Sequence, residues 1–396
     1  MKVAILSVTE KGKKLSNNLK QLLEKDPTII DIHTFHKNIK KNINDIFNDI
    51  HSDNLNNNNN FNNGLNDNLS KNHNTNFDVI IGIMATGILI RSIALNIQSK
   101  TRDPAIIAMD EKGKYTISLV SGHLGRANEI TEKIAKLTNS KPVITTATDI
   151  NNKIGIDTLV NKYYWEIDNK NNILNFNKAI LEEKRINLLI NKKKNKKIKY
   201  IDDIKNYLKS QNHNTVEIID LKNEELSIEN KYPELSSVDI TEINRNPNKN
   251  FDLVATFHKH RLFFREKNMV LGIGAKANVS KEKVIKAIHA SVKNLNIPIE
   301  RINSIATAEI KANEVGILEA VKELKIPFKI ITLNEIKEFN HSDISCSKLV
   351  EEKFGISGVC EPSALIGACE NKYSKPKLIH KKTAIDGVTV AIAISS

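Results

Sequence analysis

The sequence has few of the residues that mark a disulfide-stapled or membrane-spanning protein. It contains 3 cysteines among 396 residues. None forms a Cys-x-x-Cys pair, and an odd number of separated thiols predicts a reduced, cytoplasmic protein rather than a disulfide framework. The most apolar stretch, residues 79–90, ends at Arg91 and is too short to span a bilayer as a helix. No signal peptide is expected, because the first residues form a strand-like run that leads directly into charged residues.

Aromatic residues are also scarce, at 5% of the chain, whereas the formal net charge is +13. A basic surface attracts polyanions such as nucleic acid, anionic lipid or a small molecule with many carboxylates. Because the aromatic side chains are not interleaved with the basic ones, the pattern does not favour binding of nucleic acid. The lysine-rich run 192–197 supplies part of the charge and is typical of a solvated surface. A P-loop, an HExxH motif and a zinc-type Cys/His spacing are all missing.

Short apolar runs alternate with segments of helical periodicity, which predicts an α/β fold with mostly parallel sheets. The expected elements of an N-terminal α/β domain, 1–165, are 2–9, 13–23, 29–35, 77–83, 87–97, 105–110, 114–120, 124–137 and 142–146. Those of a C-terminal α/β domain, 268–396, are 269–273, 281–293, 302–306, 313–324, 328–332 and a hairpin of 378–382 with 388–394. A small, polar α/β middle region, 166–265, joins the two domains. Residues 51–76, about half of them Asn, are predicted to be a disordered insertion.

A first group of polar residues follows the predicted strand 77–83. Free backbone N–H groups at a helix start around Thr86 and Gly87 suit an anionic ligand. Arg91, one turn further along, is able to hold a carboxylate with two parallel hydrogen bonds. A plain helix start with Arg91 lying along the surface explains the same residues, and the spacing alone favours that alternative.

A second group, residues 121–128, joins the predicted strand 114–120 to a helix. Gly122 and Gly125 allow a ligand to approach the backbone closely. The ordinary pKa of His123 suits proton transfer near neutrality. An N-cap by Ser121 with an exposed His123 is the plainer explanation, and the residues alone favour it.

A third group, residues 145–149, follows the predicted strand 142–146 and ends at Asp149. In open parallel sheets, ligands bind beyond the carboxyl ends of the strands. We therefore expect all three groups to converge on one crevice, although no spacing of carboxylates marks a catalytic pair.

The C-terminal part offers weaker signals. Gly272-Ile273-Gly274 lacks the third glycine of a dinucleotide fingerprint. Lys311 and Glu314 flank a strand-to-helix turn, where the helix dipole explains the acidic residue. The segment 358–362, with Cys360 and Glu361, predicts another turn into a helix, and nothing marks a base that would activate the thiol. His258 and His260 would face the same way on a strand, but two ligands alone do not make a metal site.

As an ordered series these motifs resemble the CbiG family of cobalamin-synthesis proteins. The segments that carry the resemblance are 84–91, 101–105, 121–128 and 143–149 for the N-terminal domain, and 305–314, 358–361 and 388–393 for the C-terminal domain. Two departures stand out. Arg126 replaces a glycine that the family more often has, and 275–277 read Ala-Lys-Ala where the family usually has a Cys-Arg-type segment, which argues against a covalent thiol there.

The resemblance implies an enzyme, a cobalt-precorrin-5A hydrolase, which opens the δ-lactone of a cobalt tetrapyrrole, releases acetaldehyde and gives cobalt-precorrin-5B. The cobalt would arrive with the substrate, so no cofactor is expected. Catalytic roles fall to His123, as general base or acid, and to Asp149. The residues expected to bind substrate are Thr86, Gly87, Arg91, Ser121, Gly122, Gly125, Asn128, Lys311, Glu314 and Glu361.

The implied partner is a small-molecule cobalt tetrapyrrole edged with carboxylates, with neither nucleic acid nor a membrane. A homodimer and transient contacts with neighbouring enzymes of the pathway stay open. One competing hypothesis is a non-catalytic tetrapyrrole carrier, which needs the same anion contacts but no His123. A nucleic-acid binder, suggested by the net charge, is the second.

Overall fold

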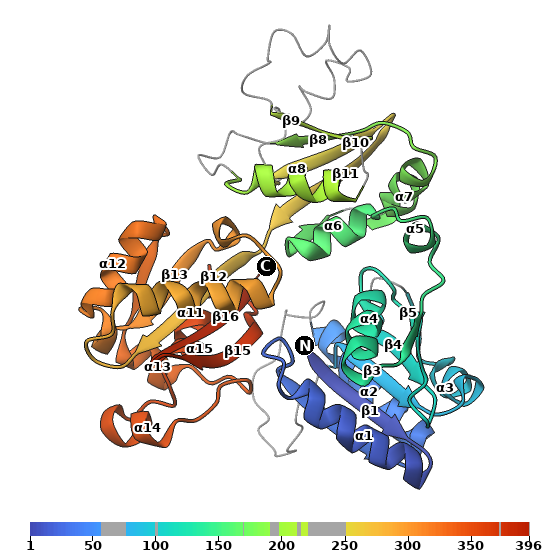
Figure 1. The fold of residues 1–396 in the computed structure, drawn as a ribbon, viewed down its shortest axis with the longest axis horizontal. Coiled ribbons are helices and arrows are strands. Elements are labelled where there is room, and N and C mark those ends of the chain that lie inside the picture. The colour runs from blue at the N-terminus through green and yellow to red at the C-terminus, as the bar shows by residue number, and fades with distance from the viewer. Residues whose placement is uncertain are drawn as a thin grey trace, which may run out of the picture. The chain divides into compact units, whose positions relative to one another are not determined.

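The computed structural model describes residues 1–56, 77–99, 102–168, 170–190, 198–211, 215–220, 251–371 and 374–395 (Figure 1). The chain divides into two compact units, Met1–Thr146 and Ala147–Ser396. None of the helices within the described ranges has the length and apolar character needed to cross a membrane.

The first unit is a six-stranded sheet in the order β2-β1-β3-β4-β5-β6. Its strands are β1 (Lys2–Ser7), β2 (Asp31–His36), β3 (Val79–Ile83), β4 (Ala105–Met109), β5 (Tyr115–Val120) and β6 (Lys141–Val143). Its helices are α1 (Glu10–Leu23), α2 (Ile39–Asn56), α3 (Thr86–Ile93) and α4 (Ala127–Thr138). Helices α1 and α4 pack on one face of the sheet, whereas α2 and α3 pack on the other. Because both faces are covered, the central strands are apolar throughout, as the continuous run at 79–83 predicts.

The hairpin of β4 and β5 changes the direction of the strands in this sheet. β1, β2, β3 and β4 run parallel to one another, β5 runs antiparallel to β4, and β6 runs parallel to β5. The carboxyl ends of β5 and β6 therefore lie at the same end of the sheet as the amino ends of β1 to β4.

The second unit begins with α5 (Ala147–Ile150) and contains two five-stranded sheets. The middle sheet has the order β7-β11-β10-β8-β9, formed by β7 (Trp165–Ile167), β8 (Ile186–Ile190), β9 (Val216–Asp220), β10 (Leu253–Phe257) and β11 (His260–Glu266). The helical segments of this part are α6 (Ile156–Lys162), η1 (Lys170–Asn172), α7 (Ile173–Leu181) and α8 (Ile201–Ser210). Only β8 and β9 pair in parallel among the described strands of this sheet, and the other pairs are antiparallel.

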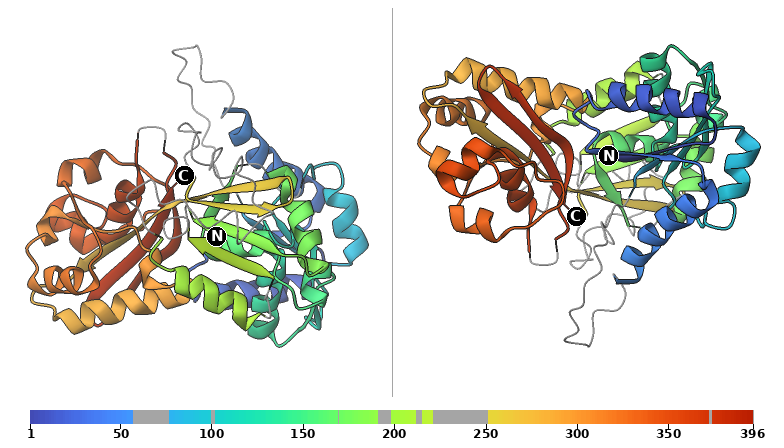
Figure 2. Two further views of the ribbon diagram at one scale, coloured as in Figure 1. Left: turned by 90° about the horizontal axis from the view of Figure 1, so that it is seen from above. Right: turned by 90° about the horizontal axis from the view of Figure 1, so that it is seen from below.

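The C-terminal sheet has the order β14-β13-β12-β16-β15. Its strands are β12 (Asn268–Ala275), β13 (Ser304–Ala308), β14 (Phe328–Ile331), β15 (Lys377–Ile385) and β16 (Val388–Ser395). The helices are α11 (Lys281–Asn294), η2 (Ile299–Arg301), η3 (Glu309–Lys311), α12 (Val315–Leu324), α13 (Leu333–Glu338), α14 (Lys348–Phe354) and α15 (Cys360–Ala368). Gly272 in β12 lets α15 cross the sheet closely, because a Cβ there would lie 1.9 Å from the carbonyl oxygen of Cys360. Figure 2 shows the yellow strands β10 and β11 of the middle sheet leading into this sheet.

The α/β fold class predicted from the sequence is confirmed, with sheets that mix parallel and antiparallel pairs. Two local expectations were wrong. α2 continues to Asn56, so the first residues of the expected disordered stretch are helical. His258 lies in the turn between β10 and β11, with φ at 48°, so it does not share a strand face with His260. The remainder of the Asn-rich stretch, 57–76, and the lysine run 192–197 fall outside the described residues, and the division into three domains stays a prediction.

A fully buried arginine joins the two sheets of the second unit. Arg301 donates hydrogen bonds to the carbonyl oxygens of Tyr163 (2.7 Å), Tyr164 (3.2 Å) and Lys267 (2.7 Å), and to Oδ1 of Asn303 (2.9 Å). Its exposed fraction is 0%. A guanidinium group offers several donors in one plane, which a lysine cannot replace. Arg301 therefore connects η2 of the C-terminal part to two segments of the chain, the turn just before β7 and the residue just after β11.

Arg301→Ala should lower the free energy of unfolding of the second unit by about 3 kcal/mol or more. The substitution removes a donor from three backbone carbonyls in the interior, of which that of Tyr164 also accepts from the Lys267 N–H at 3.4 Å, and it opens a cavity. Urea denaturation of the full chain measures the change. Arg185→Ala removes an exposed arginine that pairs with Glu217, and should change stability little. Equal effects of the two substitutions would contradict the role of Arg301.

Candidate functional site

The loop between β5 and α4 folds tightly back on itself. Ser121 and Arg126 both have positive φ, at 60° and 66°. The Arg126 N–H donates to the carbonyl oxygen of His123 (2.8 Å), and the Ala127 N–H donates to that of Ser121 (3.2 Å). Gly125 allows this closure, since a Cβ there would lie 2.5 Å from the Cβ of Ser121. His123 is thereby held, partly buried, at the tip of a compact turn.

Asn128 fixes this loop to the neighbouring strands. Its side chain is buried at 6% exposure. Ser118 Oγ in β5 donates to its Oδ1 (2.6 Å), and its Nδ2 donates to Oγ1 of Thr146, beyond β6 (2.9 Å). Both polar ends of the amide are therefore occupied, so the structure favours a positioning role for Asn128 over direct contact with a ligand.

The open hydrogen-bond donors of this region lie in the loop itself. The first N–H groups of α4, those of Ala127 and Asn128, already donate to carbonyl oxygens within the loop. Among the described residues, the N–H groups of Gly122 and Gly125 donate to no protein acceptor. Glycine leaves these groups accessible from the side where another residue would carry a Cβ. They are suited to donate hydrogen bonds to a carbonyl oxygen that becomes negatively charged during a reaction.

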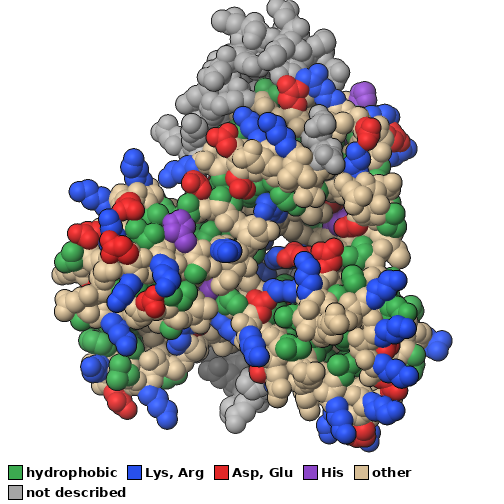
Figure 3. Space-filling view, viewed as in Figure 1, with side chains coloured by type: hydrophobic (Ala, Val, Ile, Leu, Met, Phe, Trp, Pro, Cys, Tyr) green, Lys and Arg blue, Asp and Glu red, His purple; other side chains and the backbone are tan. Residues whose placement is uncertain are grey.

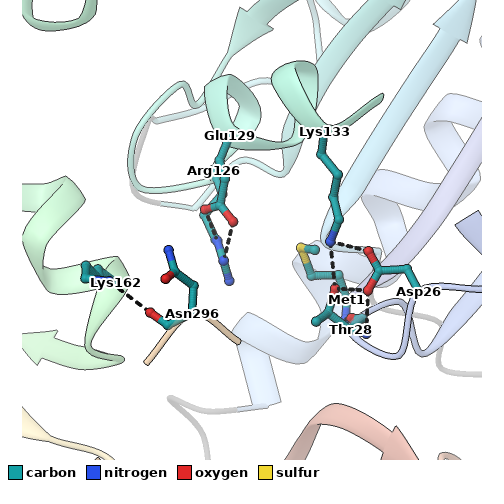
Figure 4. Close-up of polar contacts among 8 residues, drawn as sticks. All are labelled: Met1, Asp26, Thr28, Arg126, Glu129, Lys133, Lys162 and Asn296. Carbon is teal, nitrogen blue, oxygen red and sulfur yellow. Dashed lines mark hydrogen bonds and ion pairs between the residues drawn. The ribbon is translucent and has the colours of Figure 1, made fainter. Parts of the chain in front are cut away.

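Charged residues lie around the same end of the sheet of the first unit as this loop (Figure 4). Arg126 holds Glu129 with two hydrogen bonds, Nε to Oε2 at 2.8 Å and Nη2 to Oε1 at 2.6 Å. On the same helix, Lys133 contacts Asp26 and donates to Oγ1 of Thr28 at 3.1 Å. Burial raises the pKa of Asp26, but the hydrogen bonds from Lys133 and Thr28 outweigh it and lower the pKa overall.

Thr86, Gly87 and Arg91 lie at the opposite end of the sheet, beyond the carboxyl ends of β3 and β4. Ser121 Oγ donates to the carbonyl oxygen of Asp103, just before β4, whereas α3 follows β3 beside the far end of β4. The five residues of β4 put roughly 15 Å between these two ends of the sheet. The expectation of one crevice lined by Arg91 and His123 was therefore wrong, because the β4–β5 hairpin reverses the strand direction. The exposed guanidinium of Arg91 folds back over Gly87.

The two residues expected to share the catalytic work belong to different units. His123 lies in the first unit, whereas Asp149 lies on α5, an exposed position in the second unit. The strand that was expected to run to Thr146 ends at Val143. Asp149 therefore lies within a short helix rather than directly after a strand.

In the C-terminal part, Lys311 and Glu314 are paired with each other at 2.8 Å. The hydrogen bond from Lys311 lowers the pKa of the Glu314 carboxyl below its ordinary value. The second carboxylate oxygen accepts a hydrogen bond from the Asn278 N–H at 3.2 Å. This pair closes the turn between β13 and α12, so a substrate carboxylate would have to compete with Glu314 for the ammonium group.

Glu361 and Cys360 are buried at the start of α15. One Glu361 oxygen accepts from the N–H and Oγ of Ser345 (2.8 and 2.6 Å), and the other accepts from the Lys382 N–H (3.0 Å). The carboxylate therefore fixes two separate backbone segments. Burial raises the pKa of the Cys360 thiol to about 12, so it is not a thiolate at neutral pH.

One polar chain was not found from the sequence. Ser7 Oγ at the end of β1 lies 3.2 Å from Nδ1 of His36, and His36 Nε2 lies 3.1 Å from Oε1 of Glu10. The order Ser–His–Glu resembles that of a nucleophile with its base. Ser7 is only 1% exposed, however, so its hydroxyl has no room to attack a large substrate. Its evident role is to join the ends of β1 and β2 to the start of α1.

No group of three or more His, Cys, Asp and Glu side chains within the described ranges is arranged to hold a metal ion. Helix-covered sheets with strand-to-helix loops at the strand ends define the chain as an α/β protein. Residues 68–149 match the family model described as the N-terminal part of cobalamin synthesis protein G, and residues 269–393 match its C-terminal part. The chain belongs to the CbiG family of cobalamin synthesis proteins.

Relatives of known name cover most of the chain. A Methanocaldococcus jannaschii protein named "probable cobalt-precorrin-5A hydrolase" is 33% identical over 78% of this chain and 84% of its own length. A cobalt-precorrin-5A hydrolase from Salmonella typhimurium is 25% identical over 81% of this chain and 83% of its own. The crystal structure of a cobalamin biosynthesis protein G homolog from Sulfolobus solfataricus shares the fold, with a TM-score of 0.53, 22% identity and coverage of 100% of this chain and 97% of that one.

Two glycines of the first unit should respond in opposite ways to alanine. Gly125→Ala forces a Cβ to 2.5 Å from Ser121 Cβ and 2.8 Å from its carbonyl oxygen, so we expect the first unit to lose about 1–3 kcal/mol of stability. Gly87→Ala meets only the Arg91 guanidinium, at 3.5 Å or more, and lies in a helix. It should be neutral or stabilise by up to about 1 kcal/mol. Urea denaturation distinguishes the two, and a neutral Gly125→Ala would contradict the tight loop.

Proposed function

We infer that the chain is a cobalt-precorrin-5A hydrolase, an enzyme of cobalamin biosynthesis. Its membership of the CbiG family carries this conclusion, because matches to both halves of the family and to relatives named for this activity span most of the chain. The non-catalytic carrier is correspondingly disfavoured, since the named relatives are hydrolases.

The reaction that we propose opens the δ-lactone of the cobalt tetrapyrrole and releases acetaldehyde. Water adds to the lactone carbonyl and the ring C–O bond breaks, which gives a carboxylate and a hydroxyl group on the meso carbon. That hydroxyl then loses its proton, the C–C bond between the meso carbon and the macrocycle breaks, the macrocycle carbon takes up a proton, and the meso carbon leaves with its methyl group as acetaldehyde. His123 accepts the proton from water or returns it to the leaving oxygen. The N–H groups of Gly122 and Gly125 stabilise the negative charge on the carbonyl oxygen. The support is local: these three residues lie in one turn whose shape Asn128 and Ser121 fix.

The remaining expected contacts stay predictions. Thr86, Gly87 and Arg91 lie at the other end of the same sheet, so we assign them no part in the reaction at the turn that carries His123. The cobalt belongs to the substrate in this proposal, and no resident cofactor is invoked. A cytoplasmic location agrees with the free state of the three cysteines. A homodimer and contacts with neighbouring enzymes of the pathway remain hypotheses.

Nucleic-acid binding gains no support from the one face of the described residues that Figure 3 draws. On the face drawn in Figure 3, Lys and Arg side chains are scattered among Asp and Glu rather than gathered in one large patch. A strip of basic side chains along a groove is the usual footprint of a nucleic-acid binder.

Anaerobic incubation with cobalt-precorrin-5A tests the proposed activity directly. The expected result is acetaldehyde, trapped as a hydrazone, in equal amount to the cobalt-precorrin-5B identified by mass. Binding of the substrate without acetaldehyde above the enzyme-free control would favour the carrier.

His123→Ala should lower kcat by about a hundredfold or more while the protein stays folded, since a positioned acid or base contributes about 10²–10⁴-fold. The control is His289→Ala, which removes an exposed histidine of α11 in the second unit. Acetaldehyde release by the His123 variant at the full wild-type rate would show that another group moves the proton.

A further inference from the structure

Three side chains of the first unit form a chain of hydrogen bonds that ends beside the turn of His123. Ser118 Oγ on β5 donates to Oδ1 of Asn128 at 2.6 Å, and Asn128 Nδ2 donates to Oγ1 of Thr146 at 2.9 Å. An amide accepts at one end and donates at the other, so it gives the chain a direction. The chain runs from Ser118 through Asn128 to Thr146, the last residue of the unit.

The direction of this chain determines where the hydroxyl hydrogen of Thr146 points. The hydroxyl oxygen accepts from the amide of Asn128, so its single hydrogen has to point away from that amide. Among the described residues, no group accepts this hydrogen. Because Thr146 is partly exposed, the hydrogen is available to a ligand.

Two other threonine hydroxyls of the first unit do have an acceptor. Thr9 Oγ1 accepts from the Gly12 N–H at 3.0 Å and donates to Oε2 of Glu111 at 2.8 Å. Thr138 Oγ1 donates to a carbonyl oxygen of its own helix, α4, at 2.8 Å. Thr146 is held by an N–H group as Thr9 is, but within the described ranges it makes no outgoing hydrogen bond. A donor with a fixed direction and no acceptor is suited to contact a ligand.

Asn128 also places this donor beside the turn of His123. The Asn128 N–H donates to the carbonyl oxygen of Gly122 at 3.0 Å, and a Cβ on Gly122 would lie 3.1 Å from Asn128 Nδ2. The same Nδ2 is 2.9 Å from Thr146 Oγ1, so one amide contacts both neighbours. Asn128 is only 6% exposed and therefore has little room to turn. The hydroxyl of Thr146 is held next to Gly122 as a result.

We propose that the Thr146 hydroxyl is a further substrate-binding donor of this site, and that Asn128 is the positioning residue that directs it. Its acceptor is an oxygen of the lactone group, so the identity of the ligand rests on the proposed function. Both lactone oxygens gain negative charge, the carbonyl oxygen when water adds and the ring oxygen when its bond breaks. A donor to either one stabilises the transition state more than the bound substrate. Thr146 itself transfers no proton.

Thr146→Val keeps the shape of the side chain and removes the hydroxyl group. With cobalt-precorrin-5A as substrate, it should lower kcat/KM by about tenfold or more, with most of the loss in kcat. Thr146→Ser keeps the hydroxyl group and should stay within about threefold of the wild type. Equal losses in the two variants would overturn the proposal.

Thr138→Val is the matched control. It removes a hydroxyl that already donates within its own helix, roughly 15 Å along α4 from Asn128. It should change kcat/KM by less than about twofold, and circular dichroism checks that each variant is folded. A loss as large as that of Thr146→Val would show that any missing hydroxyl in this unit disturbs turnover, and would overturn the role of Thr146.

Asn128→Asp tests the direction of the hydroxyl. A carboxylate still accepts from Ser118, but it has no hydrogen to donate, so the Thr146 hydrogen turns inward to it. Both links of the chain persist while the donor is withdrawn from the substrate. We expect kcat to fall by about tenfold or more, whereas a merely structural link would leave kcat near that of the wild type.

Combining the two substitutions closes this test. Adding Thr146→Val to Asn128→Asp should lower kcat/KM by less than about twofold further, because the donor is already lost. A further loss as large as that of Thr146→Val alone would show that Asn128 does not direct the hydroxyl.

Titration calorimetry with cobalt-precorrin-5A, without oxygen, separates this proposal from the proposed activity. A wild type that binds the compound but releases no acetaldehyde would refute the hydrolase. The donor is then judged by affinity, because one hydrogen bond lost from the bound compound should weaken binding of Thr146→Val about threefold relative to Thr146→Ser. Equal affinities would refute the donor, and a wild type that does not bind the compound would refute both proposals.

Discussion

The second unit depends on one buried cation, the guanidinium group of Arg301. The chain passes from the middle sheet to the C-terminal sheet at Lys267, between β11 and β12. The turn before β7, with Tyr163 and Tyr164, lies beside this crossing, since the Lys267 N–H donates to the carbonyl oxygen of Tyr164 at 3.4 Å. Arg301 donates to the carbonyl oxygens of all three residues. Backbone carbonyls in the interior need a donor, and those of Tyr163 and Lys267 lie just beyond the paired residues of β7 and β11. One planar side chain from the C-terminal part reaches both segments.

An aromatic group reinforces the same crossing. Tyr163 stacks on Trp165 and on Tyr200, with ring centroids 5.3 Å apart in both pairs. Trp165 Nε1 donates to the Tyr200 hydroxyl at 2.7 Å, and that hydroxyl contacts Glu266 at the end of β11. Each polar group of these rings is therefore satisfied where it is buried. Packing and hydrogen bonding therefore act on the same few residues of the middle part, where the guanidinium group of Arg301 reaches Tyr163.

Much of the fold could be read from the sequence, because buried parallel strands and amphipathic helices leave strong local patterns. The missed helix α2 also had such a pattern, with Ile39, Ile43 and Phe47 on one face, hidden by its many asparagines. Arg301 could not have been recognised, since an arginine is usually exposed and its partners lie more than a hundred residues away in Tyr163 and Tyr164. The antiparallel pairs of the middle sheet are equally non-local.

The candidate site was predictable in part. The segment around His123 does join a strand to a helix, as predicted, and the N–H groups of Gly122 and Gly125 are open there, whereas the first N–H groups of α4 are occupied. The catalytic role of this turn stays a prediction. The expectation that Arg91 would join it failed for a reason already present in the sequence. The segment 111–113 signals a hairpin. A hairpin places the carboxyl end of the second strand at the opposite end of the sheet from that of the first strand. The rule that ligands gather at the carboxyl ends of strands must therefore be applied to each parallel run by itself.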